Sequence, residues 1–249
     1  MPIFDLILLV ILFFVTSVIG VITGSNSLIT VPVMFQFGID EKVAVATNMF
    51  GLTFMAIGGT IPFVRQRKID YRKLSPLVVL TLISSAIGAA LVGLITNQGI
   101  KLMVSVAMIV VAIFMLIKPD SGTEAKAVSR NAVMLTWLLT FLLGIYGGLY
   151  SGGYVTILTA MLVAFFGMTF SESVAATKFI NVFSSSIATI VFMWQGLVDY
   201  RLGIILAVTM FIGAFAGAHY ATKLNDVWIK RIFLATVFLL AIKTLFDFL

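Results

Sequence analysis

The sequence predicts an all-α polytopic membrane protein that is built from two homologous repeats. Hydrophobic residues make up 61% of the 249 residues and charged residues only 10%, whereas soluble proteins carry about 25% charged residues. Several apolar segments reach the length of about 20 residues that a membrane helix needs. The chain is also duplicated, because Gly24 and Asp70 recur as Gly153 and Asp199 at an offset of 129 residues. These observations exclude an ordinary soluble domain.

The composition also limits the chemistry that the chain can perform. It contains no cysteine and one histidine, His219, which excludes disulfides, thiolate sites and a histidine cluster for a metal. We therefore expect no metal and no cofactor. The net charge of +6 lies mostly between apolar segments, which is typical of a membrane-topology signal and not of a nucleic-acid surface. The expected setting is the lipid bilayer of the cell (inner or plasma) membrane, crossed several times.

The apolar segments divide the chain into two halves. They cover residues 3–38, 43–64, 74–96, 99–117, 131–167, 172–194, 202–222 and 230–248. The first and fifth are too long for one crossing, and each is interrupted by small and polar residues, "TGSNS" at 23–27 and "YSGG" at 150–153. We expect a first repeat over 1–118, a polar connector over 119–130 and a second repeat over 131–249, each repeat opening on a broken or re-entrant segment before three transmembrane helices.

The duplication extends over about a hundred residues. The offset of 129 pairs "IDYR" at 69–72 with "VDYR" at 198–201, and the aspartate of each motif is a good residue to cap the helix that follows. One inserted residue would then align Ala46-Thr47-Asn48 with Ala176-Thr177-Lys178. In this alignment Asn48 occupies the position of Lys178, so the fold would not require a charge there.

The basic residues favour inverted repeats. The connection over 65–73 carries five basic residues, whereas its repeat equivalent over 195–201 carries only Arg201. In the second half the basic residues are instead Lys223, Lys230 and Arg231. Because basic connections stay on the cytoplasmic side, the halves are predicted to have opposite orientations. Each broken segment would then be a re-entrant hairpin, which enters and leaves the membrane on the same side. The alternative is eight plain crossings in parallel repeats.

The two breaks predict an anion site. Non-helical backbone survives at membrane depth only where it is buried in protein or lines a cavity, and a half-helix can follow each break at 28–37 and 154–166. A helix N-terminus attracts anions, and paired broken helices are typical of transporter sites. The candidate residues at the two breaks are Ser25, Asn26, Ser27, Ser151, Gly152 and Gly153.

Some of the glycines have a different explanation. Gly144 and Gly148 are four residues apart, as are Gly213 and Gly217. Small residues at this spacing most often allow two helices to pack closely. For these four glycines we expect packing and not ligand contact.

Polar residues in the helices after the breaks complete the candidate site. Thr177, Lys178 and Asn181 span about one helical turn, and Thr47 and Asn48 occupy the corresponding part of the first half. A lysine at membrane depth costs about 2.5–3.5 kcal/mol and is a functional candidate. Lys178 is therefore expected to hold an anionic cargo. The alternatives are that it extends to the membrane surface near Glu172 or that it forms a structural ion pair.

Three segments resemble the TauE/SafE family of sulfite-exporter-type permeases. They are "GVITGSNSLITVP" at 20–32, "GIYGGLYSGGYVTIL" at 144–158 and "AATKFINVFSS" followed by "GLVDYRLG" between 175 and 203. The resemblance covers almost the whole chain and implies a transporter of sulfur-containing anions. It carries over to Gly152, Gly153, Thr177, Lys178 and Asn181. The first break departs from the consecutive glycines usual in the family and reads Gly24-Ser25-Asn26-Ser27, a difference that can shift the cargo from the family's commonest one.

We therefore expect a permease, not an enzyme, for a small anion such as sulfite, an organosulfonate or a related carboxylate. The anion would bind at the repeat interface near the bilayer midplane, and one repeat would move against the other. A non-transporting membrane partner or sensor is the alternative, and a membrane enzyme is a third class for which the sequence shows no nucleophile–base pair. The chain is also compatible with a homo-oligomer.

Overall fold

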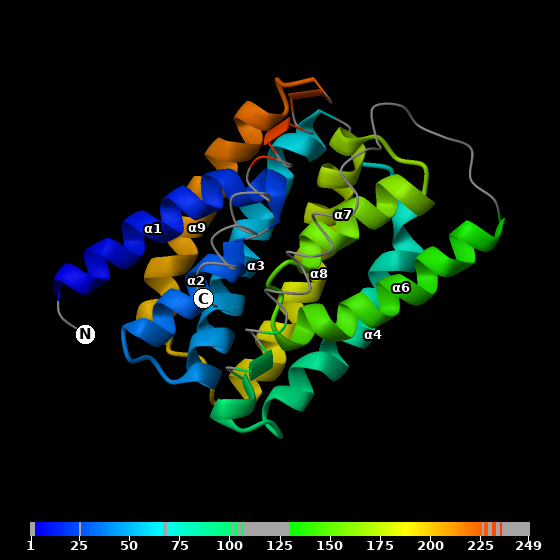
Figure 1. The fold of residues 1–249 in the computed structure, drawn as a ribbon. Helices are drawn as coiled ribbons and strands as arrows, with labels where there is room; N and C mark the ends of the chain where they lie inside the picture. Colours follow the sequence, from blue (N-terminus) through cyan, green and yellow to red (C-terminus); the bar gives the residue numbers. More distant parts are fainter. Residues whose placement is uncertain are drawn as a thin grey trace.

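The computed structural model describes residues 3–24, 26–66, 69–100, 130–225 and the single positions 102, 103, 106, 227, 228, 231, 232 and 235. Its elements are the helices α1 (Ile3–Thr23), α2 (Asn26–Gln36), α3 (Glu41–Arg65), α4 (Tyr71–Val92), α6 (Arg130–Leu149), α7 (Tyr154–Phe165), α8 (Phe170–Trp194) and α9 (Tyr200–Ala221) (Figure 1). The predicted crossings over 99–117 and 230–248 and the connector over 119–130 fall almost entirely outside the described residues.

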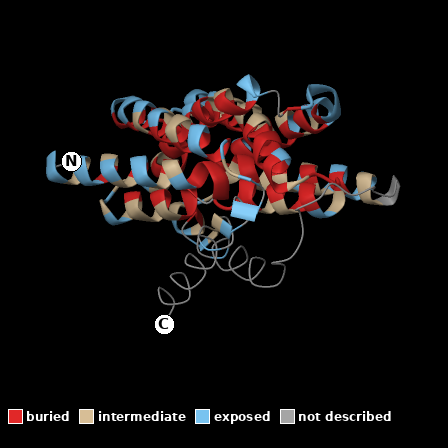
Figure 2. Ribbon diagram, turned by 90° about the horizontal axis from the view of Figure 1, so that it is seen from above, coloured by how far each residue is buried: buried red, intermediate tan, exposed pale blue. Residues whose placement is uncertain are grey.

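The all-α prediction is confirmed for the part of the chain that is described. Six of its helices are long and apolar enough to cross a membrane: α1, α3, α4, α6 from Ala132, α8 and α9. Large apolar side chains such as Ile7, Ile190 and Ile204 are exposed on their outer faces, while buried residues gather in the middle of the bundle (Figure 2). An apolar outer face is what lipid requires, so the protein is a multi-pass membrane protein.

The predicted breaks are also present, and each is followed by a short helix. α2 has 11 residues and α7 has 12. At the breaks Gly24 and Gly153 both have positive φ angles, +72° and +76°, and beyond the short helices Gly38 and Gly167 repeat this feature at +73° and +70°. Glycine adopts this left-handed conformation at little cost, so the same turns recur in the two halves.

The helix bounds keep the offset of 129 residues without an insertion. α3 and α8 both have 25 residues and begin at Glu41 and Phe170, and α4 and α9 both have 22 residues. Asp70 and Asp199 cap α4 and α9, accepting hydrogen bonds from backbone N–H groups of the first turn. The prediction that these aspartates cap helices is therefore confirmed.

The alignment of Asn48 with Lys178 is wrong. Thr30 Oγ1 donates to Asn48 Oδ1 at 2.8 Å, and the corresponding contact in the second half joins Thr159 and Thr177 at 3.1 Å. Asn48 therefore corresponds to Thr177, and Met49 corresponds to Lys178. The alignment was misled because both helices contain an Ala-Thr pair, one residue out of register with each other. The error matters because a shift of one residue rotates a side chain by about 100° around a helix.

The helices form two groups, and each group contains a helix from the other half of the chain. α1 and α3 pack against α9, and α2 packs against α1 and α3. In the other group α6 and α8 pack against α4, and α7 packs against α6 and α8. Figure 1 shows α1 beside α9 and, across the molecule, α6 beside α4. α3 and α8 contact each other at the junction of the groups. We call these the α9 group and the α4 group.

Glycines allow α9 to pack closely against α1, and α4 to pack closely against α6. A Cβ at Gly213 would lie 2.8 Å from the carbonyl oxygen of Phe14, and one at Gly217 would overlap the carbonyl of Val18. In the α4 group, a Cβ at Gly144 or Gly148 would overlap residues of α4. The packing interpretation of these four glycines is confirmed, since each lets a helix backbone approach closely.

Candidate functional site

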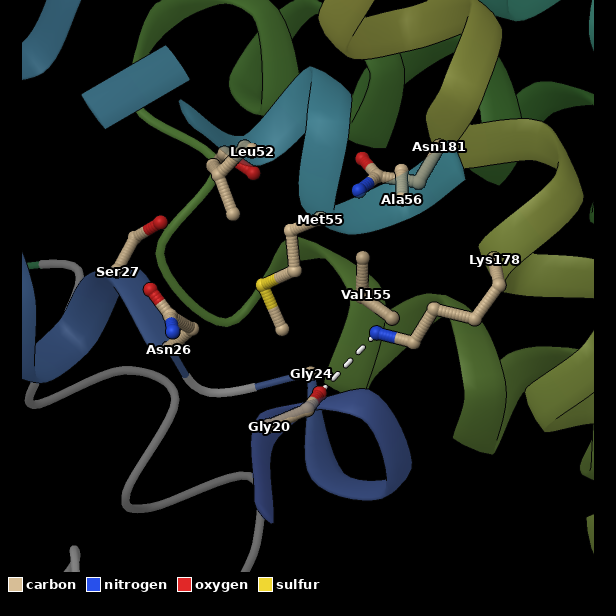
Figure 3. Close-up of a pocket in the computed structure, with 11 residues that line it drawn as sticks. Gly20, Gly24, Asn26, Ser27, Leu52, Met55, Ala56, Val155, Lys178 and Asn181 are labelled. Atoms are coloured by element: carbon tan, nitrogen blue, oxygen red, sulfur yellow. Dashed lines mark hydrogen bonds between the residues drawn. The ribbon is translucent and has the colours of Figure 1, made fainter. Parts of the chain in front are cut away.

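A small cavity lies where the two groups meet, beside both breaks. Its walls come from the α1–α2 break, α3, the α6–α7 break and α8 (Figure 3). The volume is about 10 Å³, which is room for about one water molecule. The residues that line it are Gly20, Gly24, Asn26, Ser27, Leu52, Met55, Ala56, Ser151, Val155, Lys178 and Asn181.

Five of the predicted site residues therefore share one cavity: Asn26, Ser27, Ser151, Lys178 and Asn181. They come from both halves of the chain and from segments up to 155 positions apart, as Asn26 and Asn181 are. Ser25 falls outside the described residues. Thr47, Asn48, Gly152, Gly153 and Thr177 do not line the cavity and lie behind its wall or beside it.

Lys178 points into this cavity and not toward the membrane surface. The side chain is 2% exposed, and its Nζ donates a hydrogen bond to the carbonyl oxygen of Gly20 at 3.1 Å (Figure 3). Glu172, toward which the lysine could have extended, instead closes the capping box of α8 with Thr169. Among the described residues no carboxylate pairs with Lys178, so neither the snorkelling nor the ion-pair alternative matches the structure.

The partner of Lys178 explains how a lysine is held at this depth. Gly20 belongs to the last turn of α1, and its carbonyl oxygen also accepts a hydrogen bond from Gly24 N at 2.8 Å. The carbonyl end of a helix carries partial negative charge and stabilises a cation. An ammonium group has three N–H donors, and the Gly20 bond uses one of them. Within the described part of the chain, the other two donors have no partner and are available to a ligand in the cavity.

Asn48 contributes to the cavity through Ser27. Its Nδ2 donates to Ser27 Oγ at 2.9 Å, and its Oδ1 accepts from Thr30 Oγ1 at 2.8 Å. Ser27 Oγ therefore accepts the hydrogen bond from Asn48, and the hydroxyl proton of Ser27 is left for a different acceptor. Because Ser27 lines the cavity, the arrangement provides a hydrogen-bond donor there.

The remaining polar residues join helices behind the cavity. Asn26 Nδ2 donates to Thr16 and Ser17 of α1, each at 3.1 Å. Thr47 Oγ1 accepts from the backbone N–H of Asp199 at 3.0 Å, and Thr177 bonds to Thr159. These contacts satisfy buried polar groups, as the membrane interior requires.

The second break is shaped differently from the prediction. Ser151 has a φ of +67°, which is unusual for a residue other than glycine, and it brings its side chain to the cavity. The Gly152 carbonyl accepts a hydrogen bond from Tyr146, and a Cβ at Gly152 would overlap the ring of Tyr150. Gly152 therefore makes room for a tyrosine, while Gly153 is the N-cap residue of α7.

Sequence reasoning missed the contacts that join the two breaks. Tyr150 OH donates to the Ser27 carbonyl at 2.9 Å, and Thr156 Oγ1 donates to the Thr23 carbonyl at 2.6 Å. Together with Lys178, three side chains of the second half bind carbonyls of the first break. The acceptors are backbone atoms, for which the side-chain sequence gives no signal.

Met55 was missed as well. Its thioether lies in the middle of the cavity, between Asn26 and Ser27 on one side and Lys178 and Asn181 on the other (Figure 3). Methionine is flexible and fills irregular gaps, and nothing distinguishes Met55 in sequence from the other apolar residues of α3. It is the residue that keeps the cavity small.

The cavity lining carries one formal charge, the ammonium of Lys178, and no carboxylate. Ser27, Ser151 and Asn181 add polar residues to this lining. Asn181 Oδ1 has no hydrogen-bond partner among the residues that the structure describes. A buried positive group with neighbouring donors is suited to a small anion. No group of three or more His, Cys, Asp or Glu residues that could hold a metal occurs in the described part of the chain.

Comparison with known proteins identifies the family of this chain. Residues 8–244 match the family described as "Sulfite exporter TauE/SafE". A "Probable membrane transporter protein ORF9" of Sinorhizobium sp. is 25% identical over 94% of this chain and 90% of its own length. A "Probable membrane transporter protein" of Haemophilus influenzae is 24% identical over 96% and 95%, and "Probable membrane transporter protein YfcA" of Escherichia coli K12 is 23% identical over 97% and 91%. With its multi-pass fold and nearly full-length match, this chain belongs to the TauE/SafE family of membrane transporters.

Proposed function

We propose that the protein transports a small anion, namely sulfite, an organosulfonate or a related sulfur oxyanion or carboxylate, across the cell membrane. The observation that carries this proposal is Lys178, which is buried beside both helix breaks without a carboxylate partner among the described residues. An uncompensated charge at membrane depth is costly, and a cargo anion would compensate it. The description of the family as sulfite exporters agrees with such a cargo.

In this conformation the cavity is closed. Room for about one water molecule is too little for a sulfur oxyanion, so the walls must separate before cargo enters. Movement of one repeat against the other would pull α9 and α4 from the glycine-lined contacts with α1 and α6. The α9 group and the α4 group are more suitable moving units, because the cavity lies at their junction and their internal packing would be kept.

The proposal includes inverted repeats, divided at the connector over 119–130. In Figure 1, α1 and α6 run in opposite directions on opposite sides of the molecule, which agrees with the exchange of basic residues between the halves. Accessibility of tags at both termini checks this orientation. Tags that are reached only from the cytoplasm would contradict it.

A flux assay in proteoliposomes tests the proposed cargo. The panel contains sulfite, sulfate, an alkanesulfonate, taurine and a short carboxylate, each supplied on one side of the membrane. We expect at least one sulfur oxyanion to move faster than through protein-free liposomes, and to compete with the others. If none of these anions moves, the proposal fails and a non-transporting role becomes the better explanation.

Met55 is expected to limit the size of the cargo. Met55→Ala removes the thioether from the middle of the cavity, so we expect the preference for sulfite over butanesulfonate to fall about 10-fold, within the range for added methylenes in a binding pocket. Competition flux in proteoliposomes measures the ratio. Met55→Leu is the control, since it keeps most of the volume. An unchanged ratio in Met55→Ala would show that another residue sets the size.

A further inference from the structure

A second, larger groove lies away from the cavity, at the end of the α9 group. It has a volume of about 460 Å³, within the range of small-molecule sites. Three segments line it: the start of α1, the turn after α2 and the start of α9. We call it the end groove, and its lining includes Leu6, Phe37, Ile39, Asp199, Arg201 and Ile205.

The lining of the end groove combines one charged end with apolar walls. Leu6, Phe37, Ile39 and Ile205 provide the apolar walls. These walls continue into the exposed apolar faces of α1 and α9, where side chains such as Ile7 and Ile204 are more than half exposed. In a membrane protein such faces contact lipid tails, while charged helix ends and residues such as Tyr200 lie at the headgroup level. A ligand of the groove would therefore have a polar head and an apolar tail.

The head of the groove carries one carboxylate, Asp199, and one guanidinium, Arg201. Asp199 Oδ1 accepts hydrogen bonds from the backbone N–H groups of Arg201 and Leu202 at 3.0 and 3.1 Å, so this carboxylate faces the partly positive N-terminal end of α9. Within the described residues, the guanidinium of Arg201 has neither a hydrogen-bond nor an ion-pair partner. Arginine is well suited to bind phosphate through two parallel hydrogen bonds.

At the equivalent place in the other group, a lysine side chain contacts the turn that follows α7. At the offset of 129 residues, Lys73 takes the position of Leu202 and Phe166 that of Phe37. Lys73 Nζ lies 4.8 Å from the centre of the Phe166 ring and donates to the Phe166 carbonyl at 3.4 Å. Leucine cannot make these contacts, so no such bridge crosses the end groove beside Leu202.

We propose that the end groove binds an anionic phospholipid, with its phosphate on Arg201 and an acyl chain along Leu6 and Ile205. The occupant follows from the position of the groove at a helix end, its apolar walls and the unpaired guanidinium. The proposal does not depend on the transported cargo. It implies that the two ends of this pseudo-symmetric protein contact lipid differently.

Native mass spectrometry of the full-length protein, with phosphatidylglycerol added to the detergent, tests the site. We expect one phosphatidylglycerol to bind wild-type protein about 10-fold more tightly than phosphatidylcholine, and Arg201→Gln to abolish this preference. Arg72→Gln is the matched control, because Arg72 is the repeat equivalent of Arg201 and lies next to Lys73, which contacts Phe166. Equal loss in both variants, or no loss in either, would indicate unspecific lipid contact and overturn the proposal.

Exchanging the side chains at positions 73 and 202 distinguishes lipid binding that depends on the shape of the groove from binding that depends on charge alone. Leu202→Lys adds a positive charge but should bridge the groove as Lys73 bridges to Phe166, so we expect it to lose the tightly bound lipid. Lys73→Leu removes a positive charge but also removes this bridge, so we expect a second lipid to bind. If lipid binding instead follows the charge in these variants, the groove is not the site. Should Leu202→Lys fail to fold, Lys73→Leu alone decides.

Discussion

Replacing Lys178 with methionine is expected to slow anion transport about 10- to 100-fold while the protein remains folded. A hydrogen bond from a charged group contributes about 1.5–3 kcal/mol, and each 1.4 kcal/mol corresponds to a factor of ten. Folding should be kept because the change removes a charge whose burial is itself costly, and methionine retains most of the side-chain stem. Flux in proteoliposomes and the thermal unfolding temperature measure the two effects separately.

The same variant distinguishes a cargo role from a structural one. If the ammonium only stabilises the carbonyl end of α1 through Gly20, Lys178→Met should lower the unfolding temperature without slowing transport. If it binds cargo, added anion should stabilise wild-type protein and leave the variant unchanged. Lys178→Arg keeps the charge but changes its shape, so we expect it to recover part of the flux. Normal flux in Lys178→Met would refute the cargo role.

Gly24→Ala is expected to destabilise the protein by about 2–5 kcal/mol and to impair transport. Two costs combine: alanine at a φ of +72° costs about 1–2 kcal/mol, and overpacking costs about 1–3 kcal/mol more. The overpacking arises because the new Cβ would lie 2.7 Å from Val155 Cβ, on the opposite break. Thermal unfolding in detergent measures the loss, which is a large part of the usual 5–15 kcal/mol.

Gly38 offers a matched control for this prediction. It has nearly the same φ, +73°, but a Cβ there would meet no atom within 4 Å. Gly38→Ala should therefore show the backbone cost alone, about 1–2 kcal/mol. The difference between the two variants measures how tightly the breaks pack against each other. If both alanine variants lose the same stability, contact between the breaks contributes nothing.

Much of the fold could be predicted from sequence because lipid leaves few alternatives. Apolar segments of sufficient length had to be helices, Asp70 and Asp199 marked where two of them begin, and Gly24 and Gly153 marked the breaks. The pairing of α9 with α1 and of α4 with α6 could not be predicted in this way. This pairing depends on which glycine lies against which backbone carbonyl. The spacing of glycines along one helix does not indicate which other helix packs against them.

The candidate site was predicted in part for similar reasons. Lys178 and Asn181 stand out because polar residues at membrane depth are rare and costly, and both line the cavity. Thr47 and Thr177 stand out equally, yet they bond to Asp199 and Thr159 outside it. The direction in which a threonine side chain points changes by about 100° with each residue along the helix. Whether that direction leads to a cavity or to another helix depends on the register between neighbouring helices.

The exchange of α4 and α9 also limits how such a protein can arise. Neither half contains a complete group, since α1 and α3 pack against α9 from the second half and α6 and α8 pack against α4 from the first. A precursor of half the length would have left these faces uncovered as a single molecule, and only a second copy could have supplied the missing helix. Duplication within one chain makes that partnership permanent. It also frees the two copies to differ, as Lys178 and its counterpart Met49 now do.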